Sequence, residues 1–194
     1  KLFTNDALWY STWISLELED IAAAREYADA LLELTTQEHY FLFEAVARAL
    51  KGRILSRDAK HPEAIASIQK GLEMFSMTGM VATRTFFLHA LAEAYYAAGQ
   101  VEEGVEVILK AEQFERKIGE ARHKSALQRI KGDLYLLGGD ETAAEEAYLT
   151  AITVAQNESA KLLELEAVKR LARLWRSQGK VKQATQMLQE VYDW

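Results

Sequence analysis

The stretch Leu91–Gly104, LAEAYYAAGQVEEG, decides the fold of this chain. It contains the end of one amphipathic helix, a tight turn at Gly99 and the start of a second helix. The small residues Ala92 and Gly104 allow two helices to cross closely, and the ring of Tyr95 fills the space beside the crossing. The stretch is therefore the middle of a unit of two antiparallel helices.

The same arrangement returns along the whole chain with a constant period. Aligning the turn gives one residue in each of five units: Glu19, Ala59, Gly99, Gly139 and Gly179. Small residues stand seven positions before and five positions after the turn, at Thr12, Gly52, Ala92, Gly132, Ala172, Ala24, Ala64, Gly104, Ala144 and Ala184. Each unit is thus predicted to hold a first helix, A, and a second helix, B. We expect the units at about 1–36, 37–78, 79–119, 120–158 and 159–194.

The composition of the 194 residues favours an all-α fold. Hydrophobic residues make up 49% and charged residues 27%, which suffices for a continuous core. There is one Pro and no Cys, so long helices are favoured, and disulfides and thiolate metal sites are excluded. The net charge of -6 argues against nucleic acid and anionic membranes as partners. No apolar run approaches the roughly 20 residues of a membrane span, so we expect a cytoplasmic protein.

Local signals predict where some of the helices begin. Thr35-Thr36-Gln37-Glu38 has the spacing of a capping box, with Thr35 as the cap of the second helix A. Thr142-Ala143-Ala144-Glu145 is a second candidate. Pro62 falls in the first turn of the second helix B, where its missing N–H costs nothing.

Within each unit the pattern resembles the tetratricopeptide repeat (TPR), which has a small residue, an aromatic residue three later and an Ala twelve after the first. Three units keep this spacing: Ala92, Tyr95 and Gly104; Gly132, Tyr135 and Ala144; Ala172, Trp175 and Ala184. The resemblance implies a right-handed α-α superhelix, a TPR-like solenoid of five helix pairs. The period of 40 exceeds the usual TPR length, so we expect each helix to be longer by about one turn.

From about residue 84 the chain also resembles the C-terminal TPR arm of large bacterial signalling ATPases of the STAND type. These proteins are often described as adenylate or guanylate cyclases or as transcriptional regulators. The resemblance is carried by Leu91-Ala92-Glu93-Ala94-Tyr95, Lys131-Gly132-Asp133-Leu134, Leu171-Ala172-Arg173-Leu174-Trp175 and Gln178-Gly179-Lys180. It implies a sensor or scaffold arm. Because the chain begins at Lys1 and ends at Trp194 within a helical pattern, we expect a fragment of a larger protein.

The motifs of common enzymes do not occur in the sequence. It contains no G-x-x-x-x-G-K-[ST], G-x-G-x-x-G, H-E-x-x-H or G-x-S-x-G pattern. The four histidines are far apart and form no local ligand pair: His39, His61, His89 and His123. We therefore expect no enzymatic activity, no cofactor and no metal.

The candidate binding residues lie on the A helices, which line the concave groove in TPR arrays. Positions ten, six, three and two before each turn should face this groove. The candidates are Arg53, Arg57, His89, Glu93, Tyr96, Arg129, Asp133, Lys169, Arg173 and Arg176. Arginine forks bind carboxylates, so we predict an acidic peptide, in another protein or in the same chain. The alternative is that these arginines pair with neighbouring glutamates and the groove binds nothing.

Tryptophans near the two ends form a second candidate surface. Trp9 and Trp13 could hold apolar side chains of a ligand in the groove. Alternatively, Trp9 and Trp13, and Trp194 at the other end, belong to apolar end faces that would otherwise stack on a neighbouring repeat. Such faces predict self-association.

The favoured function is a protein–protein interaction and sensor module of a bacterial signal-transduction protein. A small-molecule sensing domain of a transcriptional regulator and a structural spacer stay open.

Overall fold

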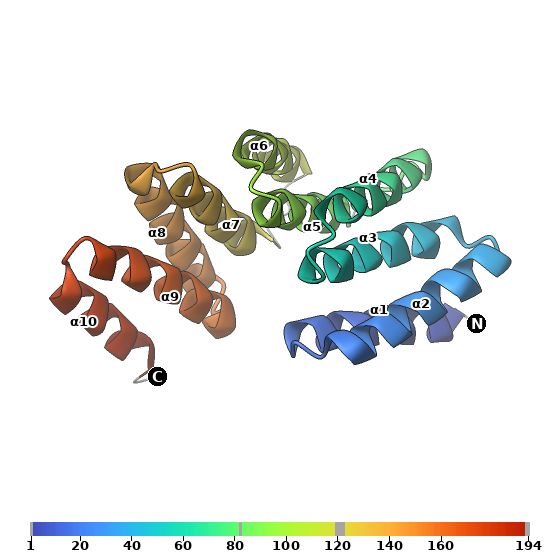
Figure 1. Cartoon of the computed structure of the whole chain (residues 1–194), viewed down its shortest axis with the longest axis horizontal. Coiled ribbons are helices and arrows are strands. Elements are labelled where there is room, and N and C mark those ends of the chain that lie inside the picture. Colours follow the sequence, from blue (N-terminus) through green and yellow to red (C-terminus); the bar gives the residue numbers. More distant parts are fainter. Residues whose placement is uncertain (1, 82, 119–122, 193–194) are drawn as a thin grey trace. The chain divides into compact units, whose positions relative to one another are not determined.

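The computed structural model describes residues 2–81, 83–118 and 123–192, and within these ranges the chain forms ten α-helices and no strand (Figure 1). Their bounds are α1 Leu2–Glu17, α2 Ile21–Gln37, α3 Phe41–Arg57, α4 His61–Met77, α5 Arg84–Ala97, α6 Val101–Ile118, α7 Lys124–Leu137, α8 Glu141–Asn157, α9 Lys161–Ser177 and α10 Val181–Tyr192. The all-α prediction is confirmed. No helix in the described ranges has both the length and the apolar character needed to cross a membrane.

The helices belong to two compact units, Lys1–Gln100 (unit 1) and Val101–Trp194 (unit 2), and consecutive helices pack against one another within each. The core of unit 1 includes Phe75 on α4 and Phe87 on α5, whose ring centroids lie 5.0 Å apart. The core of unit 2 is built around Tyr148 on α8 and Leu171 on α9. The odd-numbered helices are the predicted A helices, and the even-numbered helices are the B helices.

The five predicted turn residues all have left-handed backbones, with φ between 58° and 85°: Glu19, Ala59, Gly99, Gly139 and Gly179. The N–H of the following residue closes each turn onto the preceding helix, as Gln100 does by donating to the carbonyl of Tyr95 at 2.9 Å. The register of the repeat is thereby confirmed. Left-handed residues also stand in the connections between successive helix pairs, at His39, Gly79 and Ser159. A turn of this kind therefore recurs every half period along the chain.

The ten predicted small positions are all buried. They are buried because a larger side chain from the adjacent helix occupies the space beside them. A Cβ added to Gly132 would lie 2.5 Å from Cε1 of Tyr148, and one added to Gly104 would lie 2.7 Å from Cδ2 of Leu134. The small residues therefore set the distance between helices, as predicted.

Both predicted capping boxes are wrong. Thr35 lies inside α2, where its hydroxyl donates to the carbonyl of Leu31 at 2.7 Å, because the helix continues toward the turn at His39. The N-cap of α8 is Asp140, whose carboxylate accepts from the N–H of Ala143 at 2.9 Å. Pro62 does occupy the first turn of α4, as expected.

Candidate functional site

The A helices of unit 1 present a common surface, which we call the unit 1 A-helix face. Arg53 on α3 reaches carboxylates on both neighbouring A helices. Its Nη2 lies 3.3 Å from Oε1 of Glu17 on α1, and its Nε lies 3.1 Å from Oε2 of Glu93 on α5. These residues stand six or two positions before their turns, so the predicted positions do share one face.

Charge on the unit 1 A-helix face is balanced by these contacts. Burial would lower the pKa of Arg53, but the carboxylates of Glu93 and Glu17 outweigh it and hold this pKa above its usual value. Nδ1 of His89 lies 3.9 Å from Oε2 of Glu93, and Nε1 of Trp13 donates to Oε1 of Glu17 at 3.1 Å. Arg53 therefore joins three A helices, and an acidic ligand would have to compete with two carboxylates for it.

Two further candidates in unit 1 are exposed. The guanidinium of Arg57 makes no ion pair with any described residue, and the ring of Tyr96 is partly open to solvent. Both side chains remain available to a ligand.

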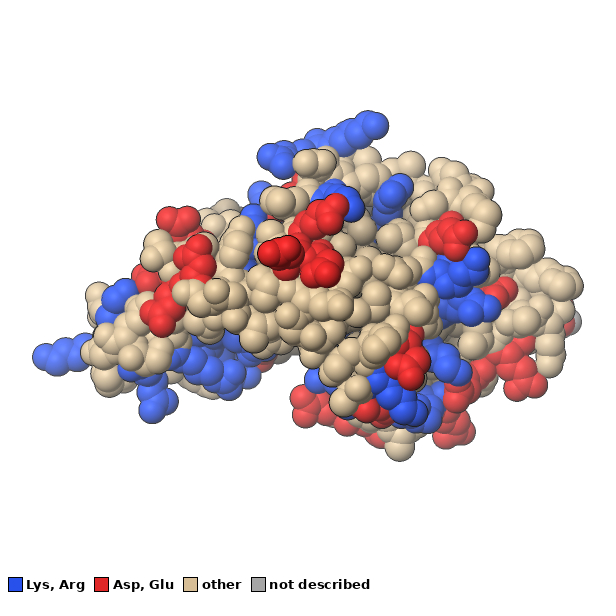
Figure 2. All heavy atoms as spheres, turned by 45° about the horizontal axis from the view of Figure 1, so that its top comes forward, with Lys and Arg blue, Asp and Glu red and all other residues tan. Residues whose placement is uncertain are grey.

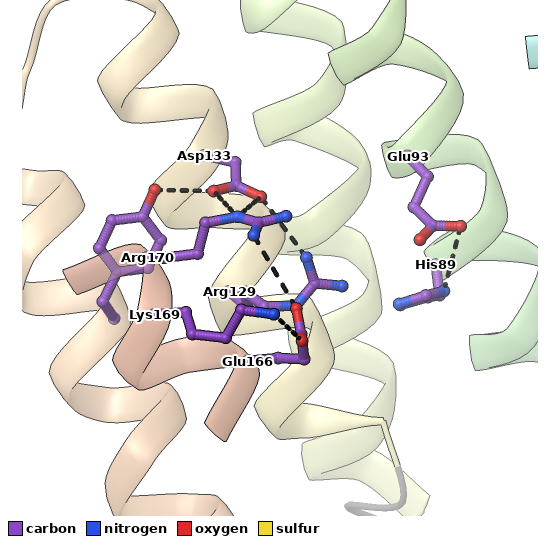
Figure 3. A network of polar contacts seen from close by, with 8 residues as sticks. His89, Glu93, Arg129, Asp133, Glu166, Lys169 and Arg170 are labelled. Carbon is purple, nitrogen blue, oxygen red and sulfur yellow. Dashed lines mark hydrogen bonds and ion pairs between the residues drawn. The ribbon is translucent and has the colours of Figure 1, made fainter. Parts of the chain in front are cut away.

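In unit 2 the candidate Asp133 is almost fully buried and forms the centre of a network (Figure 3). Its Oδ1 accepts hydrogen bonds from the hydroxyl of Tyr148 at 2.7 Å and from Nε of Arg170 at 3.0 Å. Nη1 of Arg129 lies 3.5 Å from Oδ2. Burial would lower the pKa of Arg170, but Asp133, together with Glu166 and Tyr148, outweighs it and raises this pKa. The network joins α7, α8 and α9, so Asp133 and Arg129 contribute to the packing of unit 2.

The remaining candidates lie on α9. Nζ of Lys169 lies 2.7 Å from Oε1 of Glu166, and this hydrogen bond is the main cause of the lowered pKa of Glu166. Arg173 and Arg176 are exposed and make no ion pair with any described residue. Figure 2 shows basic side chains gathered over the end of the chain where α9 and α10 lie, in agreement with seven Lys or Arg against three Glu in residues 161–192.

The structure thus separates the ten candidates into two groups. Those already held by carboxylates or hydrogen bonds within the fold are Arg53, His89, Glu93, Arg129, Asp133 and Lys169. Those with exposed side chains are Arg57, Tyr96, Arg173 and Arg176. The pairing of arginines with neighbouring glutamates, left open by the sequence, holds for Arg53, whereas Arg129 pairs with Asp133. Sequence reasoning missed Arg170, the partner of Asp133.

The tryptophan candidates have different environments. Trp9 stacks on Tyr10 with ring centroids 5.6 Å apart, and it packs against Phe43 on α3 and Phe86 on α5 at 6.4 Å and 6.2 Å. Trp9 is partly buried and packs against the core of unit 1. Trp13 is exposed, and Trp194 lies outside the described residues.

One buried carboxyl group of unit 2 has no role in these contacts. Glu115 on α6 is buried, and its Oε1 has no hydrogen-bond partner among the described residues. Burial raises the pKa of Glu115 from 4.5 to about 7, against the opposing effect of Lys124. Below about pH 7 the folded protein therefore favours the protonated form of this group.

This burial predicts a loss of stability as pH rises. The folded state binds the Glu115 proton more tightly than the unfolded state does. The contribution of Glu115 to the free energy of unfolding should therefore be largest below pH 4.5 and should decrease as the pH rises from 4.5 to about 7. Glu115→Gln should remove this pH dependence and raise the free energy of unfolding above pH 7 by roughly 3 kcal/mol. Urea unfolding of both proteins at a series of pH values measures the free energy of unfolding and its pH dependence. Glu106→Gln, an exposed change on the same helix, should keep the wild-type pH profile.

Comparison with known proteins supports the fold. No protein-family model and no curated protein sequence matches this chain. The TPR-like repeats of a Podosopora anserina kinesin light chain align with a TM-score of 0.68 and 18% identity, over 97% of this chain and 92% of that one. A Rap protein complexed with competence and sporulation factor aligns with a TM-score of 0.80 and 16% identity, over 99% of this chain and 53% of that one. BtubC (BKLC) from P. vanneervenii gives a TM-score of 0.66 and 13% identity, over 98% and 89%.

These similarities confirm the TPR-like fold. The chain spans about half of the Rap protein and nearly all of the other two chains.

Proposed function

We propose that this chain is a protein–protein interaction module that binds an acidic peptide segment on its A helices. The observation that carries the proposal is the pair Arg173 and Arg176 on α9, which are exposed and have no carboxylate partner among the described residues. The fold supports it as well, since the Rap protein of similar fold was solved in complex with a competence and sporulation factor.

The chemistry of α9 favours a carboxylate ligand. Residues three apart on a helix are neighbours on its surface, so the guanidinium groups of Arg173 and Arg176 can engage one peptide together. Each guanidinium presents a planar fork of donors that matches a carboxylate. The basic excess of the last helix pair, within a chain of net charge -6, would draw an acidic segment toward this helix.

The resemblance from residue 84 onward favours the sensor arm of a bacterial signalling ATPase, in which the bound segment belongs to a partner or to another part of the same protein. The alternatives are sensing of a small inducer and a spacer role. A rise in melting temperature with metabolites but not with peptides would favour the first alternative, and tolerance of all A-helix substitutions would favour the second.

The binding prediction is tested with a double substitution. Arg173→Ala with Arg176→Ala should weaken binding of a fluorescein-labelled oligoglutamate peptide by about ten-fold or more, measured by fluorescence anisotropy at low salt. The loss is expected because two charge-assisted contacts disappear while the fold is unaffected.

Lys182→Ala is the matched control, since Lys182 is an exposed basic residue on the B helix α10. It should bind the peptide as the wild type does. Equal weakening by both variants would show that only net charge matters, and unchanged binding by the double variant would refute the assignment to α9.

A further inference from the structure

The buried carboxyl of Glu115 on α6 breaks the pattern of the repeat. It stands sixteen positions after the turn residue Gly99, and α2, α4 and α8 carry an uncharged residue at the same position. These residues are all 0% exposed: Thr35, Phe75 and Ala155. Burial of a charge is unfavourable, so the packing of the helices gives no reason for a carboxyl at this place.

Glu112, three residues earlier on α6, departs from the repeat in the same way. The corresponding residues of α2, α4 and α8 are apolar and pack against the cores of their units: Leu32, Leu72 and Ile152. Oε1 of Glu112 accepts hydrogen bonds from Nε2 of Gln128 at 2.7 Å and from Nζ of Lys131 at 2.8 Å, both on α7. The contact between α6 and α7 is therefore polar where the other repeats are apolar, and Glu112 is satisfied within it.

The groups around Glu115 come from three helices and do not balance its charge. Burial raises the pKa of Glu115 to about 7, although Lys124 in the first turn of α7 and the N–H of His123 favour the charged form. Glu112 on α6 and Glu158 at the C-cap of α8 repel the charge and raise this pKa further. The side chain is 5% exposed, and its Oε1 has no hydrogen-bond partner among the described residues.

We propose that the carboxyl of Glu115 is a pH-sensitive switch, which holds the C-terminal part of α6 against α7 when protonated and releases it when ionised. The neutral carboxyl can stay buried between the helices. The carboxylate lacks water there and faces two other carboxylates, so its solvation favours movement of α6 away from α7. The core that α8 shares with α9 does not include Glu115, so it can persist while α6 is released.

The pH range of the switch follows from the two environments of the carboxyl. The released group has its ordinary pKa of 4.5, whereas the buried group has a pKa of about 7. The equilibrium constant for release should therefore rise by up to about ten-fold per pH unit between these values and level off above pH 7. This inference does not depend on peptide binding by α9.

Hydrogen–deuterium exchange of the whole chain tests the switch, read by mass spectrometry from about pH 5 to pH 8 and corrected for the intrinsic rate of amide exchange. In the wild type the protection of the amides in the last three turns of α6 should fall by more than about ten-fold between pH 5 and pH 7. The amides of α9 should stay more strongly protected than those of α6 at every pH, because α8 and α9 remain packed.

Two substitutions remove the titrating group. Glu115→Gln keeps the size of the side chain, and Glu115→Ala introduces the residue type that α8 carries at this repeat position. In both variants the protection of α6 should be independent of pH over the same range. Glu106→Gln is the matched control, since Glu106 is an exposed carboxylate on the same helix, and it should keep the wild-type response.

Three results would overturn the proposal. One is a wild type in which the protection of α6 does not change with pH. Another is a Glu115→Gln variant that retains the wild-type response, which would assign the response to another group such as His123. The third is equal protection of α6 and α9 at every pH, which would show that unit 2 opens as a whole rather than by release of α6.

Discussion

Replacing Asp133 with alanine should lower the free energy of unfolding by about 3–5 kcal/mol. The carboxylate accepts hydrogen bonds from Tyr148 and Arg170 inside unit 2, and the Asp133 side chain is only 4% exposed. Removing it leaves the buried hydroxyl of Tyr148 and the partly buried charge of Arg170 without this partner. Urea unfolding followed by far-ultraviolet circular dichroism measures the loss, which corresponds to a fall of about 10 °C in melting temperature for a chain of this size.

The control for this prediction is an exposed ion pair of the same unit. Glu106 on α6 pairs with Lys110 at 2.7 Å, and both side chains are mostly in solvent. Glu106→Ala should change stability by no more than about 0.5 kcal/mol, since such pairs contribute little. If Asp133→Ala costs no more than Glu106→Ala, the network around Asp133 does not stabilise unit 2.

Gly71→Val should destabilise unit 1 by about 3 kcal/mol. A Cβ at Gly71 on α4 would lie 2.6 Å from the carbonyl oxygen of Ala45 on α3 and 3.3 Å from the ring of Phe87. The first neighbour is backbone and cannot rotate away, so α3 and α4 must separate to admit the side chain. Urea unfolding of the variant and the wild type gives the difference.

Gly99→Ala separates steric crowding from backbone strain. No atom lies within 4 Å of a Cβ at Gly99, but its φ is 73°, so alanine should cost about 1 kcal/mol through backbone strain alone. A Gly71→Val variant as stable as Gly99→Ala would mean that the two helices are not in close contact at this point.

The register of the repeat could be predicted from the sequence because it depends on local sterics that recur in every 40-residue repeat. Small residues are required wherever two helices cross, and left-handed turns are required wherever the chain reverses. The turns at His39 and Ser159 were harder to predict, since neither residue type is typical of a left-handed position and the helical packing on both sides imposes it.

The partners of the charged residues were the part that the sequence left undetermined. Arg53 pairs with Glu17 and Glu93, and Arg170 pairs with Asp133, all on neighbouring A helices at sequence distances near one period. A usable signal did exist, because Arg53 and Glu93 have opposite charges at the same position of successive 40-residue repeats. Comparing charges across the aligned units, rather than within one helix, would have identified this pair.

The left-handed residues at regular intervals also constrain how a chain of this kind can change in length. They recur at Glu19, His39, Ala59, Gly79 and Gly99, so one helix with its turn occupies half a period. Duplication or loss of one full period leaves every later helix in its A or B position. A change of half a period would place later A helices in B positions and later B helices in A positions. Growth and shortening by recombination should therefore occur in whole helix pairs, while ion pairs that span one period, such as Arg53 with Glu93, would change partners.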